Sequence, residues 1–378
     1  MPSNRIEAEY RPSYLAAAIT AASIFVLYLV TLSPTVAMWD AGEYIAAAKV
    51  LGIPHPPGNP FFMLLAKVFG MLPIHATFPQ RINTLSAITS AVSAGIWFLI
   101  TERALGGIIR ERWQRILGGV LAALIGATAF TVWNQSVVNE KVYNVSLLFF
   151  TIVSWLALEW ADDPDSKRAD RILVLIAYLL GLGYANHPAG FLAAPAVAVL
   201  ILWRRWQTFL RWKLVLVSIA ALILGLTPFI YEPIRAAYFP AINEGEPTAC
   251  TTEIGVSCTF DKVTYKRLMS NIKREQYGVK EGRGAPYSAQ VGMWWLYFKW
   301  QWLRDSMGTR APAQAVLAVT FLMLGLVGGY VHYRSDKRSF WYFGPLMFTM
   351  TLALIYYLNF KYGASQAPDL SGVQREVR

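Results

Sequence analysis

Charged residues are scarce in this chain of 378 residues: Asp, Glu, Lys and Arg together make up 15%, against 55% hydrophobic residues. A soluble domain of ordinary composition carries about a quarter charged residues. Internal repeats and low-complexity tracts are lacking too, and no small-residue cleavage motif closes the first apolar run, so we expect a membrane span there and not a signal peptide. These absences exclude an ordinary soluble protein and indicate an integral membrane protein.

The formal net charge of +11 comes from Lys and Arg residues that lie in short clusters between apolar runs. Such clusters are typical of topology signals and of contacts with anionic lipids, not of a nucleic-acid-binding face. We therefore expect the lipid bilayer, and no nucleic acid, as a partner.

Charge-free apolar runs long enough to cross a bilayer, which takes about 20 residues, predict the membrane spans. One of them, 172–203, is interrupted by Asn186, His187 and Pro188, and we interpret it as two short helices joined by a tight turn. The other runs are 14–32, 82–101, 116–139, 142–158, 214–231, 311–331 and 339–360. The prediction is an all-α integral membrane protein with about nine transmembrane helices.

The distribution of Lys and Arg predicts the orientation. If the N-terminus is cytoplasmic, sixteen basic residues fall in inner segments and four in the outer connections 33–81, 140–141 and 184–190. The inner segments are 1–13, 102–115, 159–171, 204–213 and 332–338. Basic residues favour the cytoplasmic side, so this layout is preferred to a single tilted span at 172–203, which would invert everything after it. We expect a bacterial-type inner or plasma membrane with the active site facing outward.

Two large loops are predicted on the outer face, within a membrane domain, 1–360, that precedes a polar tail, 361–378. Loop 33–81 contains a short apolar stretch that suits an interfacial or re-entrant helix. Loop 232–310 contains a tryptophan-rich stretch suited to the headgroup region and to substrate or lipid contact. It also holds Cys250 and Cys258, for which a disulfide and two free thiols remain open.

An unusual set of polar and ionisable side chains falls on this predicted outer face. The set comprises Asp40, Glu43, His55, Arg81, Glu140, Lys141, Asn186, His187, Glu232 and Arg235. Ionisable groups at membrane depth are costly and usually face a cavity or a partner, so we expect a polar cleft that opens outward. The structural alternative is that the carboxylates cap helices and that His187 only caps its turn. Asp40 fits that alternative least well.

A transferase that works outside the cytoplasm needs a donor that arrives through the lipid, such as a polyprenyl-phosphate sugar. Asp40 suits the general base, and Arg235 with Arg81 or Lys141 suits the leaving phosphate. A transporter is disfavoured because its charges usually lie near the midplane within repeats. A third alternative is a structural subunit in which Asp40 is only a cap.

The run WDAGEYIAAAKVLGIPHPPGNPFFMLLAKVFGMLP resembles the opening signature of a family of polytopic proteins placed with the C-type (GT-C) glycosyltransferases and related to protein O-mannosyltransferases. WNQSVVNEKVYNVS, LGLGYANHPAGFLAAPA and YEPIRAAYFPAINEGEPT resemble its later blocks, in order. The resemblance implies a GT-C-like fold, a polyprenyl-phosphate sugar donor, possible mannose transfer with inversion, and catalysis by Asp40, with Glu43 and His55 in the same loop.

Two features of the sequence qualify this resemblance. The acidic pair reads Asp-Ala-Gly-Glu and not Asp-x-Asp, which argues against a divalent metal, and the sequence identifies no cofactor with certainty. Members of the family usually continue with more spans and a soluble part, so we expect a fragment or a shortened member. The acceptor, protein Ser/Thr hydroxyls or an envelope glycan or lipid, stays open.

Overall fold

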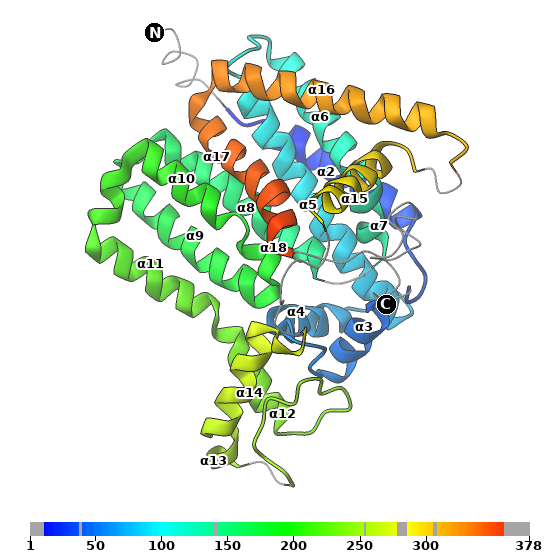
Figure 1. Ribbon diagram of the computed structural model, residues 1–378, viewed down its shortest axis with the longest axis vertical. Coiled ribbons are helices and arrows are strands. Elements are labelled where there is room, and N and C mark those ends of the chain that lie inside the picture. The colour runs from blue at the N-terminus through cyan, green and yellow to red at the C-terminus, as the bar shows by residue number, and fades with distance from the viewer. Residues whose placement is uncertain are drawn as a thin grey trace.

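The computed structural model describes residues 11–37, 40–138, 142–252, 255–277, 286–304 and 308–358. Within these ranges the chain is helical and forms no strand, and its one isolated β-bridge joins Ile53 to Asn243 (Figure 1). The α-helices are α2 (Tyr14–Val30), α3 (Ala41–Val50), α4 (Pro60–Gly70), α5 (Phe78–Leu105), α6 (Arg112–Thr128), α7 (Phe130–Val137), α8 (Tyr143–Asp162), α9 (Lys167–Asn186), α10 (Ala194–Arg205), α11 (Trp212–Gly225), α12 (Tyr231–Ala236), α13 (Val256–Thr259), α14 (Lys262–Lys273), α15 (Tyr287–Trp302), α16 (Ala311–Ser335), α17 (Lys337–Phe348) and α18 (Leu354–Leu358).

In the described ranges, six helical segments are long and apolar enough to cross a membrane. The number rises to eight if each of two bent helix pairs forms one further span. The bent pairs are α6 with α7, at 69°, and α11 with the segment Thr227–Ala236, at 40°. The first predicted span, α2, has only 17 residues, about 26 Å at 1.5 Å per residue and shorter than the hydrocarbon core. A multi-pass helical protein is thus supported, whereas the count of nine is not confirmed.

The interruption predicted inside 172–203 is present. Helix α9 ends at Asn186, a short 3₁₀ turn follows from Pro188, and α10 then begins at Ala194. Helix α11 packs on α9 so closely that a Cβ on Gly181 would lie 2.2 Å from the Leu222 carbonyl oxygen, and one on Gly225 would lie 2.3 Å from that of Tyr178. Glycines at both positions let the two backbones approach.

Polar contacts divide the bundle into two ends. At one, which we call the basic end, the predicted inner segments bind each other: Arg103 pairs with Glu159 and Asp162, and Arg211 pairs with Asp170. The remaining contacts there are Arg205 with Asp165, Arg168 with Glu159, and Ser13 with Glu102. The predicted inner segments thus meet at one end, away from α3, α4 and α12 (Figure 1).

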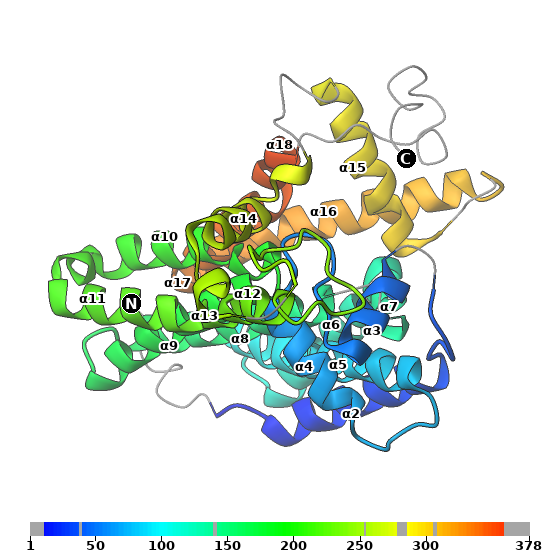
Figure 2. The same cartoon turned by 90° about the horizontal axis from the view of Figure 1, so that it is seen from below.

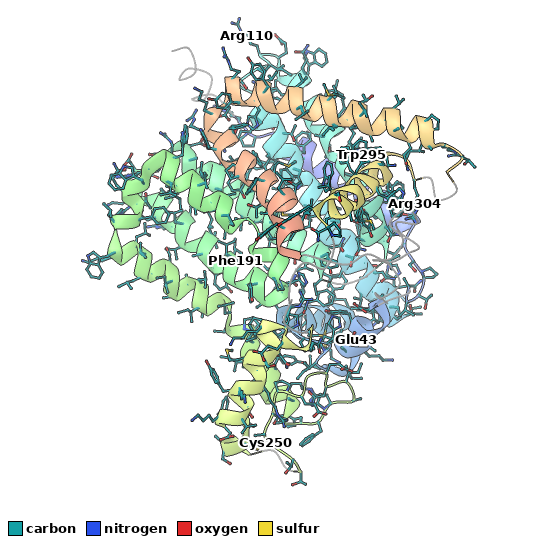
Figure 3. The ribbon with its side chains drawn as sticks, in the orientation of Figure 1. Glu43, Arg110, Phe191, Cys250, Trp295 and Arg304 are labelled. Carbon is teal, nitrogen blue, oxygen red and sulfur yellow. A yellow bond between two sulfur atoms is a disulfide. The ribbon has the colours of Figure 1, made fainter. Side chains whose placement is uncertain are left out.

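The opposite end, which we call the loop end, carries α3, α4, α12, α13 and α14. Figure 1 and Figure 2 show α12 near α3 and α4. In Figure 3, Glu43 and Cys250 lie at the loop end and Arg110 lies at the far side of the molecule. Cys250 and Cys258 form a disulfide, which settles the choice that the sequence left open.

Helices occupy both predicted outer loops: α3 and α4 in the first, and α12 to α15 in the second. Their position at a membrane interface stays a prediction. A buried apolar cluster supports the first of these loops, and it joins residues of α3 and α4 to the start of α8. Its buried members include Tyr44, Ala48, Phe62, Met63, Ile82, Val142 and Phe149, with Tyr231 packed against it. This cluster fixes the backbone on which the candidate site is built.

Candidate functional site

The candidate site is built around a carboxylate–histidine pair at the loop end. Glu43 lies in the first turn of α3, and its two oxygens accept from the backbone N–H of His55 at 2.6 Å and from the His55 ring Nδ1 at 2.8 Å. Because an ionised carboxylate only accepts, Nδ1 carries the hydrogen. The Nε2 atom then faces the Tyr44 hydroxyl at 3.5 Å. One glutamate therefore fixes the loop backbone and the ring of His55 together.

The environment of Glu43 acts on its pKa in two directions. Partial burial raises the pKa, but the hydrogen bonds from the His55 ring and backbone, with the charge of His55, outweigh burial and lower it below its usual value. The neighbouring Asp40 opposes this by like-charge repulsion. Glu43 is thus held as the anion, close to the second carboxylate that the sequence singled out.

Asp40 occupies the N-cap position of α3, and its carbonyl accepts from the Tyr44 N–H at 3.0 Å. The Asp40 side chain makes no capping hydrogen bond to the helix, and the residue is partly exposed. The structural alternative, in which Asp40 serves as a side-chain cap, therefore gains no support from the geometry.

The loop between α3 and α4 has an unusual backbone. Leu51, Gly58 and Asn59 have φ angles of 53°, 77° and 48°, and the Pro56–Pro57 bond is cis. Pro60 follows at the first position of α4, where its fixed φ suits a helix start. A Cβ on Gly58 would lie 2.5 Å from Glu232 Oε1. Gly58 is therefore required both by its backbone angle and by close contact with Glu232.

Helix α12 holds this loop from the other side. The Tyr231 hydroxyl donates to the Leu51 and Gly52 carbonyl oxygens at 2.8 and 3.0 Å, and Arg235 Nε donates to Leu51 at 2.6 Å. Arg235 also reaches the Val50 carbonyl at 3.1 Å. These contacts satisfy carbonyl groups at the C-terminus of α3, which have no partner within the helix. Arg235 thus positions the loop, and its predicted role toward phosphate stays a prediction.

Two buried side chains in this region make no hydrogen bond within the described structure. Glu232 is 0% exposed and Asn59 is 1% exposed, and the polar side-chain atoms of both lack a partner. Buried polar groups are nearly always paired, so each exception needs an explanation. Both flank Gly58, one by contact and one by sequence, and so lie beside the loop that carries His55.

The remaining predicted site residues surround this core at the loop end. Arg81 donates to the carbonyls of Gly70 and His75 and so holds the end of α4. Asn186 is buried and donates to the Val142 carbonyl and the Ser146 hydroxyl. His187 accepts from the Ala189 N–H, as a cap of its turn would. Glu140 and Lys141 lie outside the described residues.

The structure brings Glu43, His55, Glu232 and Arg235 together through α3, its following loop and α12. These contacts define the gathering, and two pockets among the described residues lie elsewhere, one between α9 and α11 and one between α9, α10 and α11. Within the part of the chain that is described, no group of three or more His, Cys, Asp and Glu residues has the arrangement of a metal site.

Sequence reasoning missed several residues of this region. They include Tyr231, Asn59 and Asn83. Asn83 is 1% exposed and donates to the Ser33 and Thr35 carbonyls in the segment before α3. The Gly-Asn-Pro run could have predicted the turn before α4, since Gly and Asn favour positive φ and Pro favours a helix start. The role of Asn83 could not be predicted, because its hydrogen-bond partners lie far away in the sequence.

The fold and the site define the class: a multi-pass helical membrane protein with a polar loop held between a short helix and the exit of a later span. Comparison with known proteins then gives a direction. The family profile described as Protein O-mannosyl-transferase TMEM260 N-terminal domain matches residues 40–210, from Asp40 to the turn before α11.

The chain is also similar to two curated proteins. Protein O-mannosyl-transferase TMEM260 of Mus musculus is 29% identical over 259 residues, which cover 68% of this chain and 33% of the mouse protein. Protein O-mannosyl-transferase tmem260 of Dictyostelium discoideum is 23% identical over 274 residues, covering 68% and 30%. The chain thus spans about a third of the length of the curated relatives that it matches. No solved structure matches it.

Proposed function

We propose that this chain is the catalytic membrane part of a glycosyltransferase that moves a sugar, mannose by analogy with its relatives, from a polyprenyl phosphate to Ser or Thr hydroxyls of proteins. Its support is the family profile that matches from Asp40 to residue 210 and the similarity to proteins named protein O-mannosyl-transferases. The single observation that carries the site is the Glu43–His55 pair, which fixes the loop beside Asp40.

The reaction is a single displacement with inversion. The acceptor hydroxyl attacks the anomeric carbon from the face opposite the phosphate, and Asp40 takes the hydroxyl proton. The bond between the anomeric carbon and the phosphate oxygen breaks, and its electron pair leaves with the polyprenyl phosphate. A positioned base contributes about 10²- to 10⁴-fold to the rate of such a step.

The Glu43–His55 pair acts as a positioning device in this mechanism. By holding both the backbone and the ring of His55, Glu43 ties the start of α3 to the loop 51–59 and so fixes the distance between Asp40 and that loop. Proximity of this kind lowers the barrier because the reacting groups need not be ordered during the reaction.

The leaving phosphate needs cations. Lys141 keeps its predicted role there, while Arg81 and Arg235 contribute at least by holding backbone carbonyls. Glu232 keeps its predicted substrate-binding role and Asn59 joins it, since the buried polar atoms of both have no hydrogen-bond partner among the described residues.

We place this site outside the cytoplasm. The excess of basic residues at the other end of the bundle favours that orientation, and the Cys250–Cys258 disulfide at the loop end suits an oxidising compartment. Because both relatives are eukaryotic, only the extracytoplasmic face is proposed, and a bacterial-type membrane has no support from them.

The test is Asp40→Asn, which removes the base and keeps the size of the side chain. Cells that lack the protein are complemented with wild type or variant, and O-linked sugars on extracytoplasmic proteins are measured by glycopeptide mass spectrometry. Complementation with wild type should restore the glycopeptides. The variant should leave transfer reduced at least about 100-fold, with normal amounts in the membrane.

Asp163→Asn is the matched control, because Asp163 is an exposed carboxylate at the end of α8. It should restore glycosylation fully. Unchanged glycopeptides in the strain without the protein would remove the enzyme proposal, and full activity of Asp40→Asn would remove Asp40 from the base role.

A further inference from the structure

A pocket of about 670 Å³ opens at the basic end of the bundle, between the first turns of α9 and those of α11. It lies far along α9 from the turn at Asn186, and nothing in the proposed transfer reaction uses it. Its lining residues are Asp170, Arg171, Val174, Arg211, Trp212, Lys213, Leu214 and Val217. The pocket therefore combines charged groups with an aliphatic wall.

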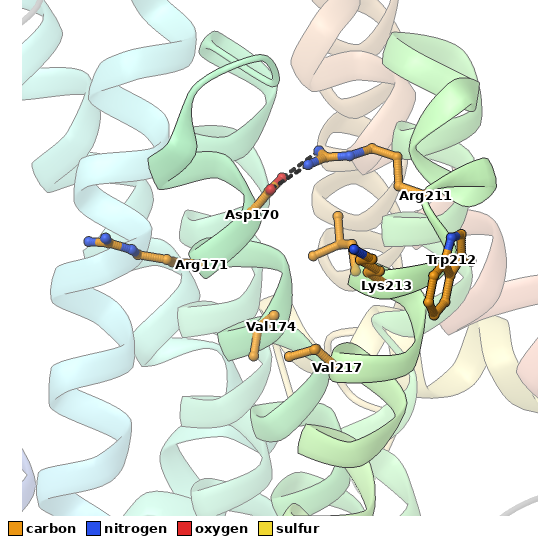
Figure 4. A pocket seen from close by; sticks show the side chains of 8 residues that line it. Asp170, Arg171, Val174, Arg211, Trp212, Lys213 and Val217 are labelled. Atoms are coloured by element: carbon orange, nitrogen blue, oxygen red, sulfur yellow. Dashed lines mark hydrogen bonds and ion pairs between the residues drawn. The ribbon is translucent and has the colours of Figure 1, made fainter.

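The charges of the pocket do not cancel. Arg211 makes two hydrogen bonds to the carboxylate of Asp170, which ties α11 to α9 and neutralises both groups. Arg171 and Lys213 add two further positive charges, and in Figure 4 the Arg171 side chain extends from α9 away from α11. Lys213 lies 5.6 Å from the centre of the Trp212 ring, and the described structure gives neither cation an acidic partner. The net charge of +2 calls for an anion.

The apolar wall of the pocket identifies the kind of anion. Val174 of α9 and Leu214 and Val217 of α11 form its apolar lining, and Val217 is 53% exposed. Trp212, 65% exposed, also lines the pocket, and exposed tryptophans are common at the level of lipid headgroups. A second, apolar cavity of about 220 Å³ between α9, α10 and α11 shares Leu214 with it. A free phosphate would leave these apolar surfaces unused, whereas a phospholipid covers them with an acyl chain.

The start of α11 adds to the attraction. Its first residue, Trp212, and the following Lys213 line the pocket, and no side chain caps this helix start. The N-terminus of a helix carries a partial positive charge that favours phosphate. Cationic side chains, a helix start and an exposed aliphatic wall thus meet at one place.

We propose that this pocket binds one anionic glycerophospholipid of the leaflet at the basic end, with the headgroup phosphate beside Lys213 and the start of α11, attracted also by the charge of Arg171, and with an acyl chain along Val174 and Val217. The site is at the other end of the bundle from Glu43 and is independent of the proposed transfer reaction. Bound lipid would support the packing of α9 on α11 at the end away from the close approach at Gly181 and Gly225.

Native mass spectrometry of the purified protein tests this inference. The protein is titrated with phosphatidylglycerol, with phosphatidylcholine and with a polyprenyl phosphate. Wild type should retain one phosphatidylglycerol in preference to phosphatidylcholine. The double variant Arg171→Gln/Lys213→Gln should bind it roughly tenfold to thirtyfold more weakly, because each basic residue near a lipid surface contributes about 1 kcal/mol.

The matched control is Arg110→Gln/Lys337→Gln, which removes the same two charges from exposed positions outside the pocket. It should bind like wild type. Val174→Trp fills the pocket, keeps every charge and should also weaken binding. Each variant must elute as a monodisperse species and keep its helical circular dichroism, so that misfolding does not explain a loss of binding. Equal losses in both double variants, equal retention of the two phospholipids, or a preference for the polyprenyl phosphate would each overturn the proposal.

Discussion

The carboxylates at the two ends of the bundle differ in their burial and in their partners. At the basic end, carboxylates such as Asp162 and Asp170 lie at least partly exposed and pair with arginines from neighbouring segments. At the loop end, Glu43 is bound to His55, whereas Glu232 is fully buried with no partner in the described structure. Exposed pairs of this kind contribute little to stability, but a buried carboxylate without a partner is costly.

This difference suggests that charge at the basic end sets the topology, whereas the loop end holds the groups proposed to carry out the chemistry. The basic end needs only a surplus of positive charge and tolerates many arrangements of it. The loop end depends on individual atoms: a carbonyl of Leu51, the missing Cβ of Gly58, the two oxygens of Glu43. Substitutions of single residues should therefore have large effects at the loop end and small ones at the basic end.

Gly58→Ala should have the largest effect. The added methyl group meets a φ of 77° and would lie 2.5 Å from Glu232 Oε1. Left-handed strain of about 1–2 kcal/mol and overpacking of about 1–3 kcal/mol together predict a loss of about 2–5 kcal/mol in the free energy of unfolding. Chemical denaturation in mixed micelles measures it, and transfer activity should fall with it.

Gly325→Ala is the control for Gly58→Ala, since a Cβ at this position of α16 meets nothing within 4 Å. It should leave stability unchanged or raise it by up to about 1 kcal/mol, as expected for Gly replaced by Ala in a helix. Adding Glu232→Ala to Gly58→Ala should recover part of the lost stability by removing the clash. No recovery in the double variant would mean that the contact with Glu232 contributes nothing.

Glu43→Gln should have an intermediate effect that depends on pH. Because His55 lowers the pKa of Glu43, the pair stabilises the fold above the ordinary range of glutamate, about 4.3, and this contribution is lost as the pH falls through the lowered pKa. At neutral pH the variant should lose about 1.5–3 kcal/mol, the range for hydrogen bonds to a charged group. Thermal unfolding between pH 3 and 7 measures it.

The control for Glu43→Gln is Glu111→Gln, an exposed glutamate before α6 that makes no capping bond. It should keep the acid dependence of wild type. If Glu43→Gln also kept that dependence, another carboxylate would be responsible for it, and the pair with His55 would lose its positioning role.

Hydropathy and charge predicted much of this architecture, because both are local properties of the sequence. The break between α9 and α10 follows directly from Asn186 and Pro188 in an apolar run. The contact between Gly58 and Glu232, and the bonds from Arg235 to the end of α3, could not be predicted, because they join segments that are far apart in the sequence. The pocket proposed to bind lipid could not be predicted for the same reason. In the sequence Arg171 and Lys213 indicate only topology, and the pocket depends on the packing of α9 against α11.

Asp170→Asn should have the smallest effect on stability. Asp170 and Arg211 have side chains that are 33% and 42% exposed, so their pair should contribute less than about 1 kcal/mol, and less still in high salt. The same substitution removes the one negative charge in the pocket and frees Arg211. Binding of phosphatidylglycerol should therefore become tighter while the unfolding midpoint stays nearly constant. Weaker binding would mean that the ion pair, and not the surplus of positive charge, shapes the headgroup site.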